Sequence, residues 1–251
     1  MLDDINKERQ AVEEIIQEAA RSSCKTLDIA TTGALVLASG DWHPGVIGIV
    51  ASRIVEEFYR PAALISVKDG IGKGSARSIP GFDLHQGLSA CSDLLLGFGG
   101  HKYAAGFTIA EDRIPELRER LGSIVLRQMG PQGFVRTLAV DGAVALDELT
   151  LDLMQEIEHM APFGQGNPEP RLGARGLTVL SVKTVRNNHL KLQLRQQGGS
   201  PFGAISFSRR GRPAKTVLEG SKVAIVFTPR INVWNGKTAV ELEIRDVKNE
   251  K

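Results

Sequence analysis

The nine residues Gly99-Gly-His-Lys-Tyr-Ala-Ala-Gly-Phe107 carry the most information about this chain. The adjacent glycines Gly99 and Gly100 let a backbone approach a ligand closely, because no side chain stands in the way. His101 and Lys102 follow at once and can hold a phosphate or an oxyanion. The apolar residues 104–109 predict a buried strand that anchors this loop. The stretch suits a polyanionic substrate, and the alternative, a tight structural turn with a core histidine, stays open.

The segments around this stretch alternate between strand and helix. Strands are expected at 34–38, 62–67 and 71–78, and helices at 3–22, 45–59, 83–96 and 113–128. This alternation predicts an α/β layer with a mostly buried sheet. The first helix has a narrow apolar stripe that needs a partner, so we expect residues 1–24 to be a connector and residues 25–129 to be the first domain.

Beyond Gly130-Pro-Gln-Gly133 the pattern changes, and we place a domain boundary there. A strand is expected at 136–144, a helix at 146–160, a turn-rich loop at 161–170, and short strands at 177–185, 190–195, 203–207, 222–228 and 239–247. Asn235-Gly236 is a strong hairpin signal between the last two strands. Five strands separated by turns suit a small closed β-barrel, such as the OB-fold, over residues 133–251.

The charges of the chain are distributed unevenly. Its 251 residues carry a net charge of +2, but residues 1–129 hold 14 Lys/Arg and 17 Asp/Glu, whereas residues 130–251 hold 17 and 12. Residues 171–237 contain 13 basic residues and a single acidic one, Glu219. A segment of one sign often marks a surface that binds a polyanion. A chance excess on a mixed surface is the alternative.

The composition indicates a soluble protein of a reducing compartment. Cys24 and Cys91 are the only cysteines and do not form a C-x-x-C pair, which argues against a disulfide framework or a zinc ribbon. No apolar stretch approaches the roughly 18 residues that span a bilayer, and no signal peptide is recognisable. We therefore expect a cytoplasmic protein.

Two segments of the first domain could hold an anion. Trp42 and His43 precede a predicted helix whose N-terminal N–H groups favour negative charge, and Trp42 could stack on a base. Alternatively, Trp42 is a core anchor. Lys73, Ser75 and Arg77 lie at even spacing, so on a strand all three point to one face and form a plausible phosphate cradle. A flexible hairpin is the alternative here.

The predicted barrel offers a charged groove with stacking platforms, an arrangement that binds single strands without reading their sequence. Candidate backbone contacts are Lys183, Arg186, Lys191, Arg195, Arg209, Arg210, Arg212 and Arg230. Candidate stacking groups are Phe207, Trp234 and His189, although core packing is an alternative for each aromatic ring. The five histidines are scattered, and the motifs Asp-His-His, His-Glu-x-x-His and Gly-x-Ser-x-Gly are absent. The sequence therefore predicts no metal site and no self-sufficient catalytic centre.

Four segments, taken together, resemble the C-terminal part of the RecJ exonucleases of the DHH superfamily. They occur in the family's order and cover nearly the whole chain: Trp42-His-Pro-Gly-Val-Ile-Gly-Ile-Val-Ala-Ser-Arg53, Gly74-Ser-Ala-Arg-Ser78, Gly99-Gly-His-Lys-Tyr-Ala-Ala-Gly106 and Ala161-Pro-Phe-Gly-Gln-Gly-Asn-Pro-Glu-Pro170. The third alone would indicate only a DHHA1 domain. The resemblance implies an α/β DHHA1-type domain followed by an OB-fold-like barrel that binds single-stranded DNA.

The resemblance also implies roles for individual residues and a departure from the family pattern. His101 would face the scissile region in an assisting role, and Ser75 and Arg77 would hold the DNA 5′ end; Arg53 is a weaker candidate. RecJ enzymes degrade single-stranded DNA from 5′ to 3′ with Mn²⁺ or Mg²⁺ held by a DHH domain. No DHH pattern occurs in these residues, so we expect binding without hydrolysis.

Two alternative functions stay open at this point. The chain could be an adaptor whose basic barrel binds an acidic protein partner, such as the tail of a single-strand-binding protein. It could also belong to a phosphoesterase of short RNA, although the attached barrel speaks against that. We expect a monomer.

Overall fold

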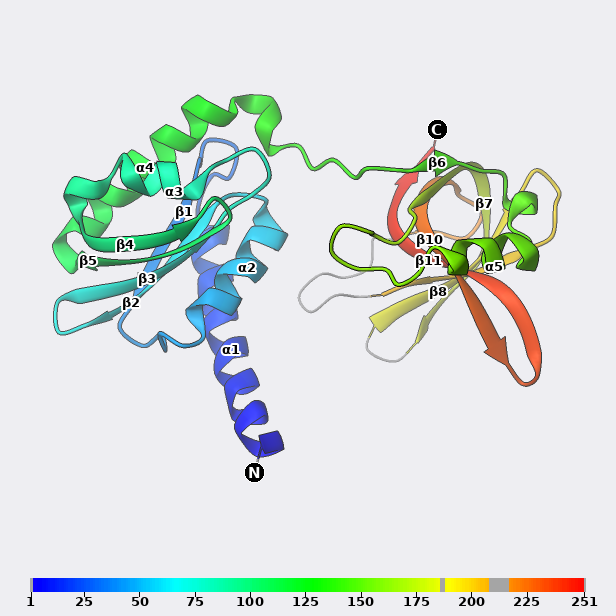
Figure 1. The fold of residues 1–251 in the computed structure, drawn as a ribbon, viewed down its shortest axis with the longest axis horizontal. Helices are drawn as coiled ribbons and strands as arrows, with labels where there is room; N and C mark the ends of the chain where they lie inside the picture. The colour runs from blue at the N-terminus through cyan, green and yellow to red at the C-terminus, as the bar shows by residue number, and fades with distance from the viewer. Residues whose placement is uncertain (1, 186–187, 208–216, 251) are drawn as a thin grey trace. The chain divides into compact units, whose positions relative to one another are not determined.

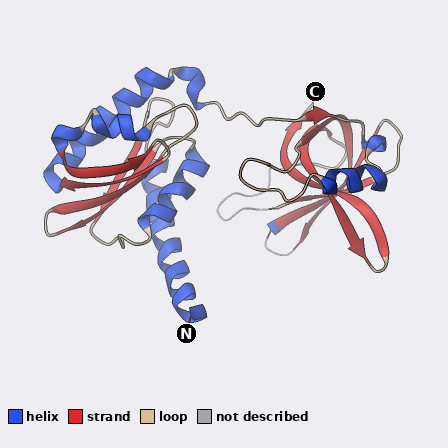
Figure 2. Cartoon of the chain, in the orientation of Figure 1, coloured by secondary structure: helices blue, strands red, loops and turns tan. Residues whose placement is uncertain are grey.

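The computed structural model describes residues 2–185, 188–207 and 217–250. The chain divides into two compact units, residues 1–136 and 137–251 (Figure 1). Figure 2 shows that unit 1 combines helices with a sheet, whereas unit 2 is built mainly of strands. Among the helices of the described ranges, none is both long and apolar enough to cross a membrane.

Unit 1 contains a five-stranded sheet with the strand order β1-β2-β3-β5-β4. Its strands are β1 (Leu35–Ser39), β2 (Ala62–Lys68), β3 (Ile71–Arg77), β4 (Leu95–His101) and β5 (Ala104–Ala110). The apolar strands β1 and β2 pair in parallel, and the helix between them in sequence is the crossover connection. The other strand pairs are antiparallel. β4 is the last strand of this sheet, and its pairing with β5 is interrupted by a bulge between Leu95 and Gly97.

The two faces of this sheet are covered differently. Helices α3 (Leu84–Ser89) and α4 (Ile114–Met129) close one face over a core that includes Phe107, Ile109 and Leu117. Helices α1 (Leu2–Lys25) and α2 (Ile47–Phe58) cover the other face, where a second core includes Leu35 and Leu64 from β1 and β2. Residues of β4 and β5 on this second face, such as Gly99 and Gly106, remain exposed.

The helix expected at 83–96 is wrong in its second half. Asp83 caps α3 by accepting a hydrogen bond from the Gln86 N–H, but α3 ends at Ser89, a 3₁₀ turn (η1) spans Ser92–Leu94, and β4 begins at Leu95. The glycine pair was expected in a loop and instead lies in β4, because residues 95–101 pair with β5. Only Lys102 and Tyr103 separate the two strands.

Unit 2 is a closed β-barrel. Its strands are β6 (Gly142–Ala143), β7 (Leu172–Val185), β8 (His189–Gln196), β9 (Phe202–Ser206), β10 (Lys222–Trp234) and β11 (Lys237–Asn249). The order β10-β11-β9-β8-β7 closes through pairing of β10 with β7, and β6 adds a short parallel strand to β7. The barrel core includes Leu177, Leu194, Phe227 and Leu242. The predicted OB-like barrel is confirmed.

Three further expectations for unit 2 have different outcomes. The strand expected at 136–144 shrinks to β6, since residues 137–140 are exposed and only residues 142–143 pair with β7. The helix expected at 146–160 is split into a 3₁₀ turn, η4 (Leu146–Glu148), and α5 (Leu151–His159), because Thr150 caps α5 by accepting from the Leu153 N–H. The Asn235-Gly236 hairpin is confirmed, and both residues have positive φ, 48° and 74°.

Candidate nucleic-acid interface

The face of the unit 1 sheet on the side of α1 and α2 brings together residues from three neighbouring strands. Strand pairing aligns them in three rows: Lys73–Thr108–Gly97, Ser75–Gly106–Gly99 and Arg77–Ala104–His101. Because side chains alternate between the faces of a sheet, all nine positions share one face. We call Gly97, Gly99 and Gly106 the glycine shelf. With strands about 4.8 Å apart, the backbones of Arg77 and His101 are roughly 10 Å apart, so one bound nucleotide can meet both side chains.

Packing does not require glycine at the shelf positions. A Cβ atom built on Gly97 or Gly99 would meet no described atom within 4 Å, and one on Gly106 would lie 3.8 Å from the Gly74 carbonyl oxygen. Gly74 and Gly100 differ, because a side chain at Gly74 would enter the Phe107 ring and Gly100 has a φ of +143°. Glycine weakens a strand by about 0.5–1 kcal/mol relative to alanine. The shelf therefore leaves open space that its own fold does not use.

Ser75 and Arg77 form a hydrogen-bonded pair beside the shelf. Arg77 Nη1 donates to Ser75 Oγ at 3.1 Å and to the Ala76 carbonyl oxygen at 2.9 Å, and both residues are half-buried. A Cβ atom on Gly48 would lie 3.0 Å from both Ser75 Oγ and Arg77 Nη2, so the first turn of α2 lies directly against the pair. A hydroxyl and a guanidinium held this way can bind two oxygens of one phosphate.

His101 and His43 are both exposed and present the same ring nitrogen for binding. Tyr103 N–H donates to His101 Nδ1 at 3.3 Å, and Gly45 N–H donates to His43 Nδ1 at 3.1 Å. In each neutral ring the proton is then on Nε2, which can donate to a phosphate oxygen. Lys102 Nζ lies 4.7 Å from the Tyr103 ring centroid in the exposed turn after His101.

Trp42 and Lys73 have different outcomes. Trp42 is only 7% exposed and packs in the core under α2, and its carbonyl oxygen accepts from Ser66 Oγ at 2.6 Å. The predicted stacking role of Trp42 is therefore wrong, and the core-anchor alternative is correct. Lys73 is exposed and shares the face of Ser75 and Arg77, as its even spacing predicts.

The barrel places two of the predicted lysines directly opposite each other. Lys183 on β7 pairs with Lys191 on β8, and both are exposed. Like charges in such a pair are destabilising unless an anion lies between them. Lys191 Nζ is 3.8 Å from Glu241 Oε1. His189, two residues before Lys191, makes an edge-on contact with Phe207, with ring centroids 5.0 Å apart, and Phe207 is 46% exposed.

Arg230 is engaged within the barrel, so its predicted role as a DNA contact is not supported. Its guanidinium donates to Glu169 at 2.7 Å and to Glu243 at 3.0 Å, and hydrogen bonding to Glu169 raises its pKa. Arg245 completes the cluster, binding Glu243 at 2.6 Å and Glu169 at 3.2 Å. The cluster ties the 161–170 loop to β10 and β11.

Several predicted contacts lie outside the described residues: Arg186, Arg209, Arg210 and Arg212. Trp234 belongs to β10, but its side chain is likewise outside what the structure describes. Arg195 is exposed on β8, and Arg53 on α2 lies 3.7 Å from both Glu13 and Glu56. These two ion pairs tie Arg53 to the surface between α1 and α2.

Sequence reasoning missed Gly97, Gly106 and Thr108. The signal was available, because Gly97 and Gly99 alternate in a segment that pairs with Gly106. Reading residues 95–101 as a helix end and a loop concealed that alternation.

The described residues do not fit a metal centre. Within these ranges, no group of three or more His, Cys, Asp or Glu side chains is placed to hold an ion. The face of unit 1 instead offers a guanidinium, a hydroxyl, an imidazole and two ammonium groups around a bare floor. Groups of these kinds can bind phosphate oxygens, and the open floor leaves room for a flat group beside them.

Two family models match the chain, the DHHA1 domain over residues 31–126 and the RecJ OB domain over residues 140–246. The single-stranded-DNA-specific exonuclease RecJ of Bacillus subtilis is 35% identical over 249 residues, which cover 98% of this chain and 31% of that protein. RecJ of Escherichia coli is 34% identical over 257 residues, covering 98% of this chain and 44% of that protein.

A solved structure agrees with these sequence matches. RecJ from Thermus thermophilus, in complex with Mg²⁺, matches with a TM-score of 0.81 and 29% identity, over 100% of this chain and 37% of that chain. The chain thus spans less than half the length of these relatives. It belongs to the RecJ family, as the part of its members that contains a DHHA1 domain followed by a RecJ OB domain.

Proposed function

We propose that this chain is the substrate-binding portion of a RecJ-type 5′→3′ exonuclease that degrades single-stranded DNA in repair and recombination. The observation that carries the proposal is the glycine shelf, an unfilled floor bordered by Ser75, Arg77 and His101. The relatives that cover almost the whole chain are named single-stranded-DNA-specific exonucleases.

In this proposal, the terminal nucleotide lies across the three strands. Arg77 and Ser75 hold a phosphate near the 5′ end, and His101 donates from Nε2 to a second phosphate oxygen. A base or sugar lies flat on the shelf, where a side chain would lift it. His43 and Lys73 contribute at the border. His101 assists the reaction by binding the negative charge of the phosphate and is not the nucleophile.

Hydrolysis is assigned to a DHH domain of the whole enzyme. The Thermus structures were solved with Mg²⁺ or Mn²⁺, and we propose that such ions act outside these 251 residues. We expect the 251-residue chain to bind single-stranded DNA without degrading it when Mn²⁺ is added.

The barrel would hold the strand further from its end. The facing Lys183 and Lys191 supply positive charge for the backbone, and the exposed ring of Phe207 beside His189 offers a stacking surface. We propose Arg186, Arg209, Arg210 and Arg212 as further contacts to the DNA backbone. We also propose domain bounds of 25–129 and 133–251, a monomeric chain, a cytoplasmic location and a single-strand-binding protein as a further partner.

Fluorescence anisotropy with a 5′-phosphorylated oligonucleotide tests the proposal. Arg77→Ala and His101→Ala should each weaken binding about tenfold, since a charge-assisted hydrogen bond contributes roughly 1.5–3 kcal/mol. Lys25→Ala, which removes an exposed charge at the end of α1, is the matched control and should bind as the wild type does. Removal of the 5′ phosphate should reduce the difference between Arg77→Ala and the wild type.

Equal affinities for the wild type, Arg77→Ala and His101→Ala would remove the cradle from the proposal. Metal-dependent degradation by the purified chain, free of contaminating nuclease, would refute the assignment of hydrolysis elsewhere.

A further inference from the structure

We propose that residues 131–136, here called the strap, are a latch that holds the start of the linker between the two units against unit 1. The strap follows α4 and ends where the linker begins. Its first part is the 3₁₀ turn η3 (Pro131–Phe134). Release of the strap would lengthen the tether between the units.

The first contact of the latch is a stack of Arg60 on Phe134. The guanidinium carbon of Arg60 lies 3.8 Å from the Phe134 ring centroid, and Arg60 is only 7% exposed. Three carbonyl oxygens fix the guanidinium: Nε donates to Thr32, Nη1 to Tyr59 and Nη2 to Ile29, at 2.8–3.0 Å. Because Arg60 is held by the body of unit 1, the ring that stacks on it is held as well.

In the second contact the strap supplies the arginine and the rest of unit 1 supplies the aromatic ring. Arg136, at the end of the strap, lies over the Tyr59 ring at 5.0 Å and donates to the Glu56 carbonyl oxygen. Two adjacent body residues thus hold two strap residues through arginine–aromatic contacts of opposite direction. Tyr59 is the left-handed C-cap of α2, with φ 51°, which orients both contacts at the end of that helix.

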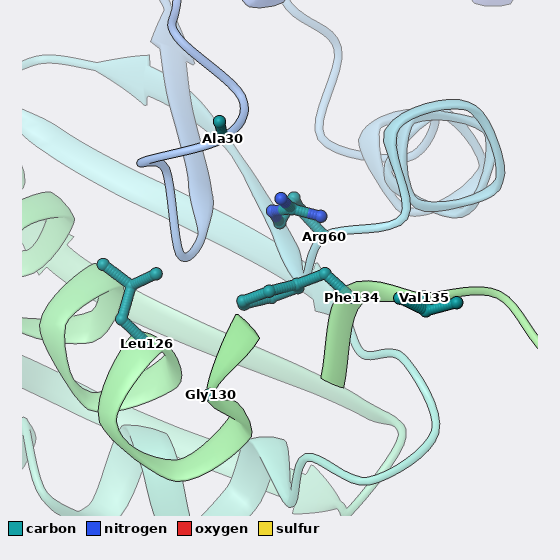
Figure 3. A pocket seen from close by; sticks show the side chains of 6 residues that line it. All are labelled: Ala30, Arg60, Leu126, Gly130, Phe134 and Val135. Carbon is teal, nitrogen blue, oxygen red and sulfur yellow. The ribbon is translucent and has the colours of Figure 1, made fainter. Parts of the chain in front are cut away.

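A cavity lies beside the contact between Arg60 and Phe134. It has a volume of about 480 Å³ and is lined by Ala30, Arg60, Leu126, Gly130, Phe134 and Val135. Figure 3 shows the Phe134 ring beneath the Arg60 guanidinium, with Leu126 across the cavity and Val135 leading away. Phe134 is only partly buried, and its ring packs between the edge of the α3/α4 core and the Arg60 guanidinium, so removal of the ring should loosen the strap.

The latch determines the length of free chain between the units. Asp141 is already anchored in unit 2, since its N–H donates to the Arg171 carbonyl oxygen and its carboxylate accepts from the Arg171 N–H, both at 2.8 Å. With the strap docked, residues 137–140 form the tether and reach at most about 14 Å. With the strap released, residues 131–140 reach at most about 36 Å.

This difference matters for a strand that contacts both units, a step that rests on the proposed function. A flexible tether has a root-mean-square length of about 5–6 Å times the square root of its residue number, so release multiplies the available volume about fourfold. The effective concentration of one unit at the other falls by the same factor. The docked strap would favour binding of one strand by both units.

Hydrogen–deuterium exchange and distance measurements on the full 251-residue chain test the latch. Phe134→Ala should increase amide exchange at residues 132–136 while the strands of unit 1 keep their protection. Spin labels at Ser89→Cys and Glu156→Cys, one in each unit, should give a broader distance distribution in the Phe134→Ala background. Phe134→Trp keeps a stacking ring and should behave as the wild type. Leu138→Ala changes only the exposed tether and should change neither readout.

The proposal fails if Phe134→Ala leaves either exchange of the strap or the distance distribution unchanged. It also fails if Phe134→Trp loosens the strap as much as Phe134→Ala. An oligonucleotide long enough to reach both units should bind Phe134→Ala about fourfold more weakly, whereas a short one should not. If the wild type binds neither, the proposed function fails while the exchange and distance results still decide the latch.

Discussion

Replacing Gly99 by alanine should stabilise unit 1 and weaken its binding of single-stranded DNA. Gly99 lies in β4 outside the left-handed region, and its added Cβ would meet no described atom within 4 Å. The substitution therefore removes backbone entropy from the unfolded chain without a clash, which is worth about 0.5–1 kcal/mol. The same methyl group raises the floor on which we propose that a base or sugar lies.

The loss of binding can be estimated from the contact that is lost. Stacking of one base contributes about 1–3 kcal/mol, and a methyl group prevents part of it, so we expect Gly99→Ala to weaken binding about fivefold and Gly99→Val more strongly. Urea unfolding measures the stability, and anisotropy with a 5′-phosphorylated oligonucleotide measures the affinity. Gly164→Ala, in an exposed loop with equally open space, is the matched control and should leave affinity unchanged.

Gly74→Ala provides the opposite case on the same sheet. Its Cβ would enter the Phe107 ring, so it should destabilise unit 1 by about 1–3 kcal/mol. If Gly99→Ala were destabilising, the shelf glycine would have a folding role that the structure does not show. If Gly99→Ala and Gly99→Val were stable and bound DNA with wild-type affinity, the shelf would not be a binding surface.

Three further predictions concern other parts of the chain. Glu169→Gln should destabilise unit 2 by about 1 kcal/mol in urea unfolding, since it weakens an ion-pair cluster in which Arg230 is partly exposed; an unchanged midpoint would show the cluster to be inert. Cys24 should resist thiol reagents in the native chain, because burial raises its pKa to about 12, and should react on unfolding; rapid native labelling would contradict its burial. Lys183→Ser should reduce the salt dependence of DNA binding by about 0.7 in log–log slope without destabilising the barrel, because it relieves repulsion from Lys191; an unchanged slope would place the strand elsewhere.

The α/β layer and the barrel could be predicted because apolar periodicity follows their strands closely. The same signal failed after Leu88. Leu84, Leu88, Cys91 and Leu94 are all buried at helical spacing, yet α3 ends at Ser89 and a 3₁₀ turn carries the pattern forward. Periodicity shows which side of a segment is buried but not whether the segment is one continuous helix. Here the α-helix α3 and the 3₁₀ turn η1 bury the same side. The strand that follows was therefore missed.

The candidate site was predictable where it depended on local spacing. Lys73, Ser75 and Arg77 share a face because they alternate along one strand. The state of Arg230 was not predictable, since the carboxylate that binds it is 61 residues away in sequence. The burial of Trp42 depends similarly on α1 and α2 packing over β1, which no local pattern reveals.

Strand β4 lies at the edge of its sheet. Protection of this edge against aggregation and access for the proposed substrate therefore place opposite requirements on its residues. Proteins protect such edges from pairing with other molecules by charges, prolines, bulges or short length. Residues 95–100 of β4 contain no charged side chain, and Leu96 is exposed, so the bulge beside it is the main local guard against edge-to-edge aggregation. A lysine at Gly97 or Gly99 would add the missing protection and would also occupy the space in which we propose that the nucleotide lies. If that proposal holds, the space that the nucleotide needs limits how far this edge can gain resistance to aggregation.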